Sequence, residues 1–238
     1  MLPHSFATAL TSARENGQFT DFTLICEGRE YAVHRIVLSC YSKVFAAAFR
    51  SGMKEATSGR YEMNEDDPFM VYRMVQYMYS GTYKDQPGMP NSEQQESASA
   101  LQIHARMFML ADKYQIDELE IVAVERYKEL LMSQRDVAAF LGSIPDVFKI
   151  TLDSKRAIRT AAVHFARCHL GKAIQNHDSL KRKYDEMAMD VPDFPAELLD
   201  SYLNVPSLVC CILCNHTQST ELSKWRCKLC KKENNTRL

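Results

Sequence analysis

The sequence predicts an α+β protein in which a small sheet is flanked by a helical cluster and followed by a helical extension and a small tail. Three observations support this class. Alternating apolar and polar residues near the N-terminus indicate a short hairpin. Apolar residues recur at helical spacing over most of the remaining chain. Finally, cysteines cluster within residues 210–230.

Composition places the chain among ordinary folded proteins. Its 238 residues are 46% hydrophobic and 25% charged, with a formal net charge of −1, which excludes wholesale disorder. No apolar run is long enough for a membrane-spanning helix, and the N-terminus shows no secretory signal. We therefore expect a cytoplasmic or nuclear protein in a reducing compartment, with no membrane partner.

The N-terminal elements follow from local patterns. Residues 5–13 carry a narrow apolar stripe at helical spacing, and Asn16-Gly17 is a helix-ending pair. Residues 21–26 and 29–34 alternate in polarity, and Glu27-Gly28 between them suits a tight turn. These signals predict a helix followed by a β-hairpin.

Turn and capping signals predict the next elements. Asp67-Pro68 begins a helix because aspartate caps and proline suits the first turn, and Ser80-Gly81 ends it. Ser42 caps the second of two short helices. The expected elements are helices at 35–40, 43–51, 68–80 and 101–114, a strand at 60–63 and a flexible polar loop at 85–97.

Helical patterns continue to about residue 202. Asp117 begins one helix, and Ser133 with Asp136 repeats the same start signal. From residue 154 the helical pattern is interrupted at Pro192, Pro195 and Pro206. We divide the chain into a domain at 1–132, a helical extension at 133–205 and a tail at 206–238.

Four ordered motifs in the first domain resemble the BTB/POZ domain. They are GQFTDFTL (17–24), VHRIVLSCYSKVFAAAF (33–49), MVQYMYSGTY (74–83) and LADKYQIDEL (110–119). The resemblance covers about residues 5–131 and implies the BTB/POZ fold, which is an α/β interaction module and not an enzyme. The sequence itself shows no catalytic constellation or glycine-rich phosphate loop, and we interpret His34 as a hydrogen-bonded structural histidine.

The resemblance also implies partners. Family members commonly dimerise through the first helix and first strand, which here implies a homodimer with contacts at Phe6, Leu10 and Phe22. Many members bind a cullin scaffold (the cullin-three class) and act as substrate adaptors of ubiquitin ligases. Their hydrophobic-x-Glu motif corresponds to Met53-Lys54-Glu55, so Met53 and Glu55 are candidate cullin contacts. The alternative is an ordinary solvated loop, and the client protein is not identified by the sequence.

The tail carries a metal-binding pattern. Cys211-x-x-Cys214 and Cys227-x-x-Cys230 supply the four thiolates that tetrahedral zinc prefers. We therefore expect a zinc-bound tail with one Zn²⁺ per chain. Cys210 in place of Cys211, or His216 in place of one thiolate, remains open. A redox Cys-x-x-Cys is the competing interpretation, but its usual βαβ context is absent.

The tail also supports a second function hypothesis. Trp225, Cys227 and Cys230 resemble one knuckle of the Ran-binding nucleoporin-type zinc finger, whose members bind single-stranded RNA or ubiquitin. The alternative function is thus a nuclear transcription or chromatin regulator whose basic tail contacts nucleic acid. The short tail does not favour this, and its lysines are most simply a solvated surface: Lys228, Lys231 and Lys232.

Overall fold

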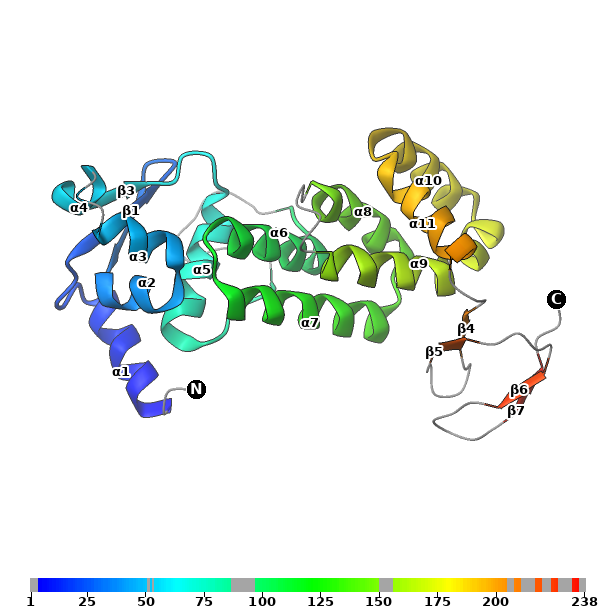
Figure 1. Cartoon of the computed structure of the whole chain (residues 1–238), viewed down its shortest axis with the longest axis horizontal. Helices are drawn as coiled ribbons and strands as arrows, with labels where there is room; N and C mark the ends of the chain where they lie inside the picture. Colours follow the sequence, from blue (N-terminus) through cyan, green and yellow to red (C-terminus); the bar gives the residue numbers. More distant parts are fainter. Residues whose placement is uncertain are drawn as a thin grey trace. The chain divides into compact units, whose positions relative to one another are not determined.

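The computed structural model describes residues 4–50, 52, 54–86, 97–149 and 156–204, and four short strands between residues 208 and 235 (Figure 1). The chain divides into two compact units, Met1–Glu129 and Leu130–Leu238.

The first unit is built on a three-stranded sheet with β1 (Phe22–Cys26) in the centre. β2 (Arg29–Val33) pairs with β1 in antiparallel fashion, and β3 (Arg60–Glu62) pairs with β1 in parallel on the other side. The turn between β1 and β2 has positive φ at both central residues, 46° at Glu27 and 76° at Gly28. This is the geometry that a two-residue hairpin turn requires, so the predicted hairpin is confirmed.

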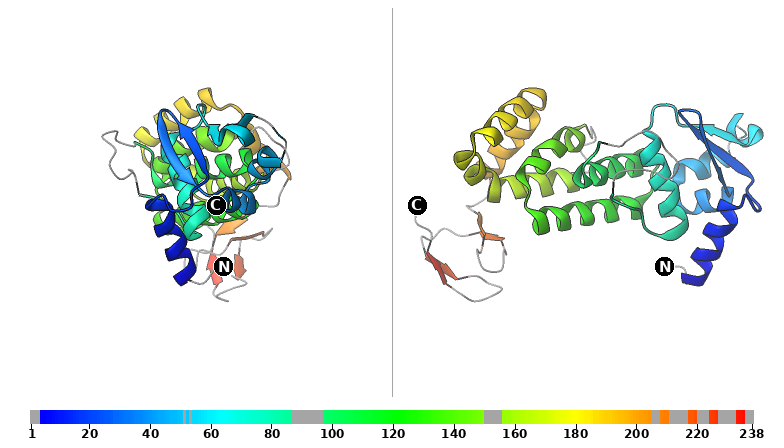
Figure 2. Two further views of the ribbon diagram at one scale, coloured as in Figure 1. Left: turned by 90° about the vertical axis from the view of Figure 1, so that its left-hand side faces the viewer. Right: turned by 180° about the vertical axis from the view of Figure 1, so that it is seen from behind.

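Helices cover this sheet and extend the unit. In the views of Figure 2, α1 projects from the rest of its unit. The helices are α1 (His4–Glu15), α2 (Arg35–Tyr41), α3 (Lys43–Arg50), α4 (Lys54–Ser58), α5 (Pro68–Ser80), α6 (Ala100–Lys113) and α7 (Asp117–Gln134).

Two of the predicted caps are present. The Asp67 carboxylate accepts a hydrogen bond from the Phe69 amide at 2.8 Å, and Gly81 ends α5 in the left-handed region at φ 73°. The Ser42 hydroxyl accepts a hydrogen bond from the Phe45 amide at 3.1 Å and donates one to the Tyr114 carbonyl at 2.6 Å. Ser42 therefore both begins α3 and ties it to the end of α6.

The core of the first unit lies between the sheet and these helices. Phe45 of α3 is the centre of an aromatic cluster, stacked on Tyr114 at 5.1 Å and edge-on to Tyr61 at 5.2 Å between ring centroids. Leu24 and Cys26 on the inward face of β1 are also fully buried. Such aromatic pairs add to the stabilisation from area burial alone.

The predicted helix start at Ser133 is wrong. α7 continues through Ser133 to Gln134, and the next helix is capped by Asp136, whose carboxylate accepts hydrogen bonds from the Ala138 and Ala139 amides. Buried Tyr127 and Leu131 hold the last turns of α7 helical. The short helix α4 was also not predicted.

The second unit is a helical cluster. Phe140 lies at its centre, 4.7 Å from Phe165 and 6.1 Å from Phe194 between ring centroids. The pattern from residue 154 divides into three helices, and Pro195 lies inside the first turn of the last one, where its missing N–H is not needed. The helices are α8 (Val137–Phe148), α9 (Ala157–Asn176), α10 (Asp178–Asp190) and α11 (Asp193–Asn204).

Two short antiparallel strand pairs complete the described chain. β4 (Leu208–Cys210) pairs with β5 (Thr217–Ser219), and β6 (Lys224–Arg226) pairs with β7 (Glu233–Asn235). The four cysteines predicted to bind zinc, Cys211, Cys214, Cys227 and Cys230, lie outside the described residues.

Candidate functional site

A groove of about 760 Å³ lies on the first unit beside α1. Its apolar side chains include Phe6 and Leu10 of α1 and Ile36 of α2, and Phe6 and Ile36 are 52% and 69% exposed. Two acidic residues at the start of α7, Asp117 and Glu118, also line the groove. Large apolar side chains around a groove indicate a surface that binds another molecule.

α1 is weakly covered by its own unit. None of residues 6–15 is buried, although the helix has a half-buried face that includes Leu10 and Arg14. The Arg14 guanidinium lies 5.2 Å from the centroid of the Tyr79 ring of α5, which anchors the last turn of α1. The N-terminal part of the helix therefore keeps its apolar side chains accessible.

The predicted dimer contacts have different positions. Phe6 and Leu10 line the same groove, as expected for a shared surface. Phe22 is only 3% exposed and packs edge-on against Phe49 at 4.7 Å, because the inward face of β1 forms the core. Phe22 is therefore buried within its own chain, whereas Phe6 and Leu10 line the groove; the dimer contacts themselves stay a prediction.

Two exposed apolar residues of the first unit were missed from the sequence. Ile36 lies in the first turn of α2, and Phe19 lies in the turn that joins α1 to β1 and is 90% exposed. Both belong to motifs that were assigned to the fold, and neither sits on an amphipathic stripe. Their exposure depends on tertiary packing, which a sequence pattern does not reveal.

The candidate cullin motif is partly described. Glu55 lies in the first turn of α4 and is half-buried. Met53 lies outside the described residues. The described part of the motif, Lys54 and Glu55, therefore forms the start of α4, after the paired helices.

His34 is a hydrogen-bonded structural histidine, as predicted. Its Nδ1 lies 2.8 Å from the Tyr79 hydroxyl, and its Nε2 lies 2.9 Å from the Gln18 carbonyl oxygen. Nε2 must donate to that carbonyl, so Nδ1 accepts from Tyr79. Both ring nitrogens are occupied in a buried setting, which leaves none for acid–base catalysis.

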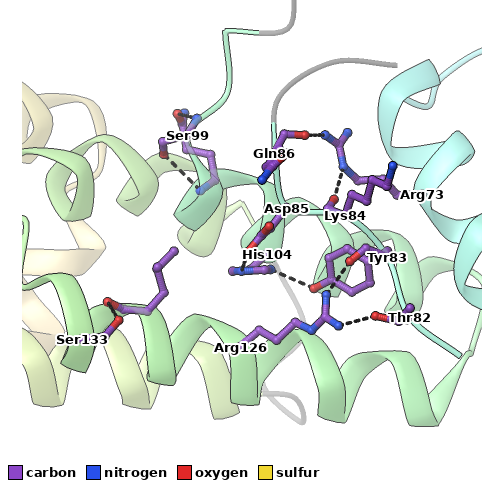
Figure 3. Close-up of polar contacts among 12 residues, drawn as sticks. Arg73, Thr82, Tyr83, Lys84, Asp85, Gln86, Ser99, His104, Arg126 and Ser133 are labelled. Atoms are coloured by element: carbon purple, nitrogen blue, oxygen red, sulfur yellow. Dashed lines mark hydrogen bonds and ion pairs between the residues drawn. The ribbon is translucent and has the colours of Figure 1, made fainter. Parts of the chain in front are cut away.

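A second buried polar network holds residues 82–86 (Figure 3). Arg73 of α5 donates to the Lys84 and Gln86 carbonyls, both at 2.8 Å. On the other side, the Tyr83 hydroxyl lies 2.9 Å from His104 Nδ1, and Arg126 donates to the Tyr83 carbonyl at 2.6 Å. The network fixes the path of the chain after α5.

Burial controls the protonation of this network. The pKa of His104 is lowered to about 4, mainly because the ring is buried; the Asp85 carboxylate opposes this shift, and the Arg126 and Arg73 guanidinium groups add to it. Burial also raises the pKa of the Tyr83 hydroxyl. Both side chains are therefore neutral at pH 7, and His104 contributes a neutral hydrogen-bonding ring.

Within the described residues, no three His, Cys, Asp or Glu side chains are grouped as metal ligands. None of the helices in the same parts of the chain is long and apolar enough to cross a membrane. The groove beside α1 is the feature that best fits an interaction protein.

Comparison with known proteins supports this view. The model of the BTB/POZ domain matches residues 10–129. The solved BTB domain of zebrafish PATZ1 is similar at 16% identity and a TM-score of 0.42, covering 53% of this chain and 91% of that one. The BTB domain of human gigaxonin is similar at 17% identity and a TM-score of 0.39, covering 51% and 87%.

The family match accounts for the first unit. It spans half of the 238-residue chain and includes α1 from Leu10 onward, the sheet and the helices to Glu129. BTB domains are interaction modules that commonly self-associate and bind partner proteins. The chain belongs to the BTB/POZ domain family.

Proposed function

We propose that this chain is a homodimeric, non-enzymatic adaptor that self-associates through α1 and recruits a client protein. The observation that carries this proposal is the exposed face of α1 and α2: α1 has no buried side chain among residues 6–15, and its Phe6 and Leu10 line a groove with Ile36. A second copy of the same face would cover these apolar side chains. Burial of exposed apolar area is the main source of association free energy.

Co-purification tests the dimer. Two copies of the full chain that carry different tags are co-expressed, and one tag is used for purification. The wild type is expected to retain the second tag, whereas Phe6→Asp with Leu10→Asp is expected to lose it, because two carboxylates would have to be buried at the contact. Ile121→Asp, at a 59% exposed position on α7, is the control. Equal retention by the double variant would refute the α1 contact.

We also infer that the adaptor binds a cullin scaffold through Met53 and Glu55. The position of Glu55 at the start of α4, directly after the paired helices, supports this assignment. A methionine side chain close in sequence to a carboxylate suits a specific protein contact, because the methionine supplies apolar area and the carboxylate can pair with a charged group.

A pull-down with the cullin scaffold tests this inference. Met53→Ala with Glu55→Ala should reduce capture without changing the circular dichroism spectrum of the chain. Glu65→Ala is a matched control, since Glu65 is an exposed carboxylate in the loop after β3. Unchanged capture by the double variant would remove the cullin assignment and leave the dimer proposal intact.

The tail is proposed to bind one Zn²⁺ through Cys211, Cys214, Cys227 and Cys230. Each Cys-x-x-Cys pair falls in the connection of an antiparallel strand pair, 211–216 after β4 and 227–232 after β6. Strand pairing brings the ends of each connection together, at Cys210 with Thr217 and at Arg226 with Glu233. Cys211 and Cys227 thus occupy the same position, directly after a strand, whereas Cys210 belongs to the strand. The metal would cross-link the two short strand pairs.

Metal analysis of the purified chain tests the zinc proposal. Protein prepared under reducing conditions without chelator should contain one zinc per chain, and Cys211→Ser with Cys227→Ser should contain none. Cys210→Ser is the matched control and should keep its zinc. Loss of zinc from Cys210→Ser would assign Cys210 as the ligand, and zinc-free wild type would refute the site.

A further inference from the structure

The last helix of the second unit, α11, carries apolar side chains on two opposite sides. Phe194 is completely buried and packs edge-on against Phe148 at 5.5 Å between ring centroids. On the other side, Leu199 and Leu203 are 58% and 73% exposed. Their i, i+4 spacing places both leucines on one exposed face of the helix. A surface helix usually presents polar residues to water, so this face needs an explanation.

The inner side of α11 fixes this face in place. Phe194 lies in the aromatic core, and the Glu197 carboxylate pairs with Arg159 of α9 at 3.2 Å. In the last turn, the Tyr202 ring lies against the Arg167 guanidinium of α9, whose central carbon is 5.0 Å from the ring centroid. The helix is therefore held from its first turn to its last. A face that is already ordered loses little conformational freedom when a partner binds to it.

The exposed side of α11 is also acidic. Asp193 and Asp200 are exposed, and α11 has no basic residue along its length. Asp200 lies three residues before Leu203, which places its carboxylate at the edge of the leucine face. Glu197 is paired with arginine, whereas in the described part of the chain no ion pair involves Asp193 or Asp200. The face thus combines accessible leucines with carboxylates.

These two properties select the chemistry of a partner. Exposed leucines favour contact with apolar side chains, and the carboxylates beside them favour basic ones. A second copy of the same face would bring carboxylates against carboxylates, which disfavours self-association through α11. A helix that carries leucines on one side and lysine or arginine on the rest satisfies both requirements. Recognition of such a helix by an apolar surface is a common binding mode.

We propose that the exposed face of α11 is the client-binding surface of this chain and that it takes a basic amphipathic helix of a partner protein. The inference rests on the proposed adaptor function, for which it supplies the chemistry of the client, and it does not depend on the α1 contact. Leu199 and Leu203 become buried against the apolar side of the partner helix, and Asp200 pairs with its basic residues. The apolar contact supplies affinity, and the carboxylate selects the charge of the partner.

Binding of a synthetic peptide tests this surface. The probe is an amphipathic helix of about 14 residues with leucine on one face and lysine on the rest, and the comparison peptide carries glutamate in place of lysine. Fluorescence anisotropy with the full chain gives the dissociation constant of each peptide. The lysine peptide should bind, and the glutamate peptide should bind at least about 10-fold more weakly.

Substitutions on α11 locate the binding site. Leu199→Ser with Leu203→Ser should raise the dissociation constant of the lysine peptide at least about 10-fold, because both leucines lose their apolar contact. Asp200→Asn should raise it about 3-fold at low salt, and this difference should shrink as the salt concentration rises. All three positions are exposed, so the variants are expected to keep the wild-type urea midpoint. The matched controls are Ile121→Ser, at an exposed apolar residue of α7, and Asp178→Asn, at an exposed carboxylate of α10, and both should bind as the wild type does.

Several outcomes would overturn the inference. One is equal binding of the two peptides, and another is equal binding of the lysine peptide by the wild type and the leucine double variant. A third is binding that requires Lys228→Gln, Lys231→Gln and Lys232→Gln, because the basic tail of the chain itself would then occupy the face. Co-purification of differently tagged copies separates this surface from the dimer. Peptide binding by a monomeric wild type would refute the homodimer alone, whereas a dimer that binds no peptide would refute this surface alone.

Discussion

Acidification should destabilise the first unit through His104. This residue is buried in α6, with its Nδ1 hydrogen-bonded to the Tyr83 hydroxyl and its Nε2 3.9 Å from Asp85. Its pKa in the folded chain is about 4, below the ordinary value of 6.5, mainly because burial disfavours the charged ring. Between these two values the unfolded chain binds more protons than the folded chain. The stability associated with neutral His104 is therefore complete above about pH 6.5 and is lost as the pH falls towards 4.

The magnitude follows from the two pKa values. With 6.5 in the unfolded state and about 4 in the folded state, lowering the pH from about 7.5 to about 5 should reduce the free energy of unfolding by about 2 kcal/mol. Burial also lowers the pKa of His164 and His169, which act in the same direction in the second unit. The contribution of His104 must therefore be isolated by substitution.

Hydrogen–deuterium exchange in increasing urea provides the assay. Peptides from α5 and α6 report the unfolding free energy of the first unit alone, at both pH values. His104→Gln keeps a hydrogen-bonding side chain that does not protonate, so its loss between the two pH values should be about 2 kcal/mol smaller than that of the wild type. His177→Gln, at an exposed position, is the control and should behave as the wild type. Equal pH dependence of wild type and His104→Gln would refute the reasoning.

Three further predictions concern stability and are measured by urea denaturation of the full chain. Phe140→Ala should destabilise the second unit by about 3–5 kcal/mol, because it leaves a cavity at the centre of an aromatic core. A decrease of the unfolding free energy by less than about 1 kcal/mol would contradict that packing. Ser99→Ala should cost about 1 kcal/mol, since Ser99 and Gln102 form a capping box at α6, and an unchanged midpoint would show that the cap is dispensable. Arg73→Met should cost about 3 kcal/mol or more by leaving the Lys84 and Gln86 carbonyls without this donor, and a neutral outcome would mean that water replaces it.

Elements whose physical cause lies within a few residues could be predicted from the sequence. The alternation before Glu27-Gly28 specified a hairpin because only one face of β1 is buried. Asp67-Pro68 and Gly81 marked α5 because a cap, a fixed φ and a left-handed residue are local requirements. Ser42 was recognised for the same reason.

Features that depend on the tertiary fold were not predictable. Ser133 and Asp136 are both good caps, and the choice between them depends on the buried end of α7, which continues past Ser133. Phe22 was assigned to the dimer surface, yet its exposure is set by the packing of Phe49 against it. The sequence pattern of a capping box is present at Ser99 and Gln102, but this helix start was missed because it follows a polar segment that was interpreted as a loop.

The candidate site shows the same division. Phe6 and Leu10 were predicted because helical spacing places both on the α1 stripe, and both line the groove. Ile36 was not, because no pattern in its own segment indicates exposure. Interaction surfaces combine residues from several elements, so only the part contributed by a regular helix can be read from sequence alone.

Sedimentation equilibrium of the full-length wild type tests the central claim most directly. We expect a mass of twice 27.3 kDa at micromolar concentration, and a single-chain mass for Phe6→Asp with Leu10→Asp. A wild type with the mass of one chain throughout the concentration range would contradict dimerisation through α1. In that case, Phe6 and Leu10 would serve another partner or pack within their own unit.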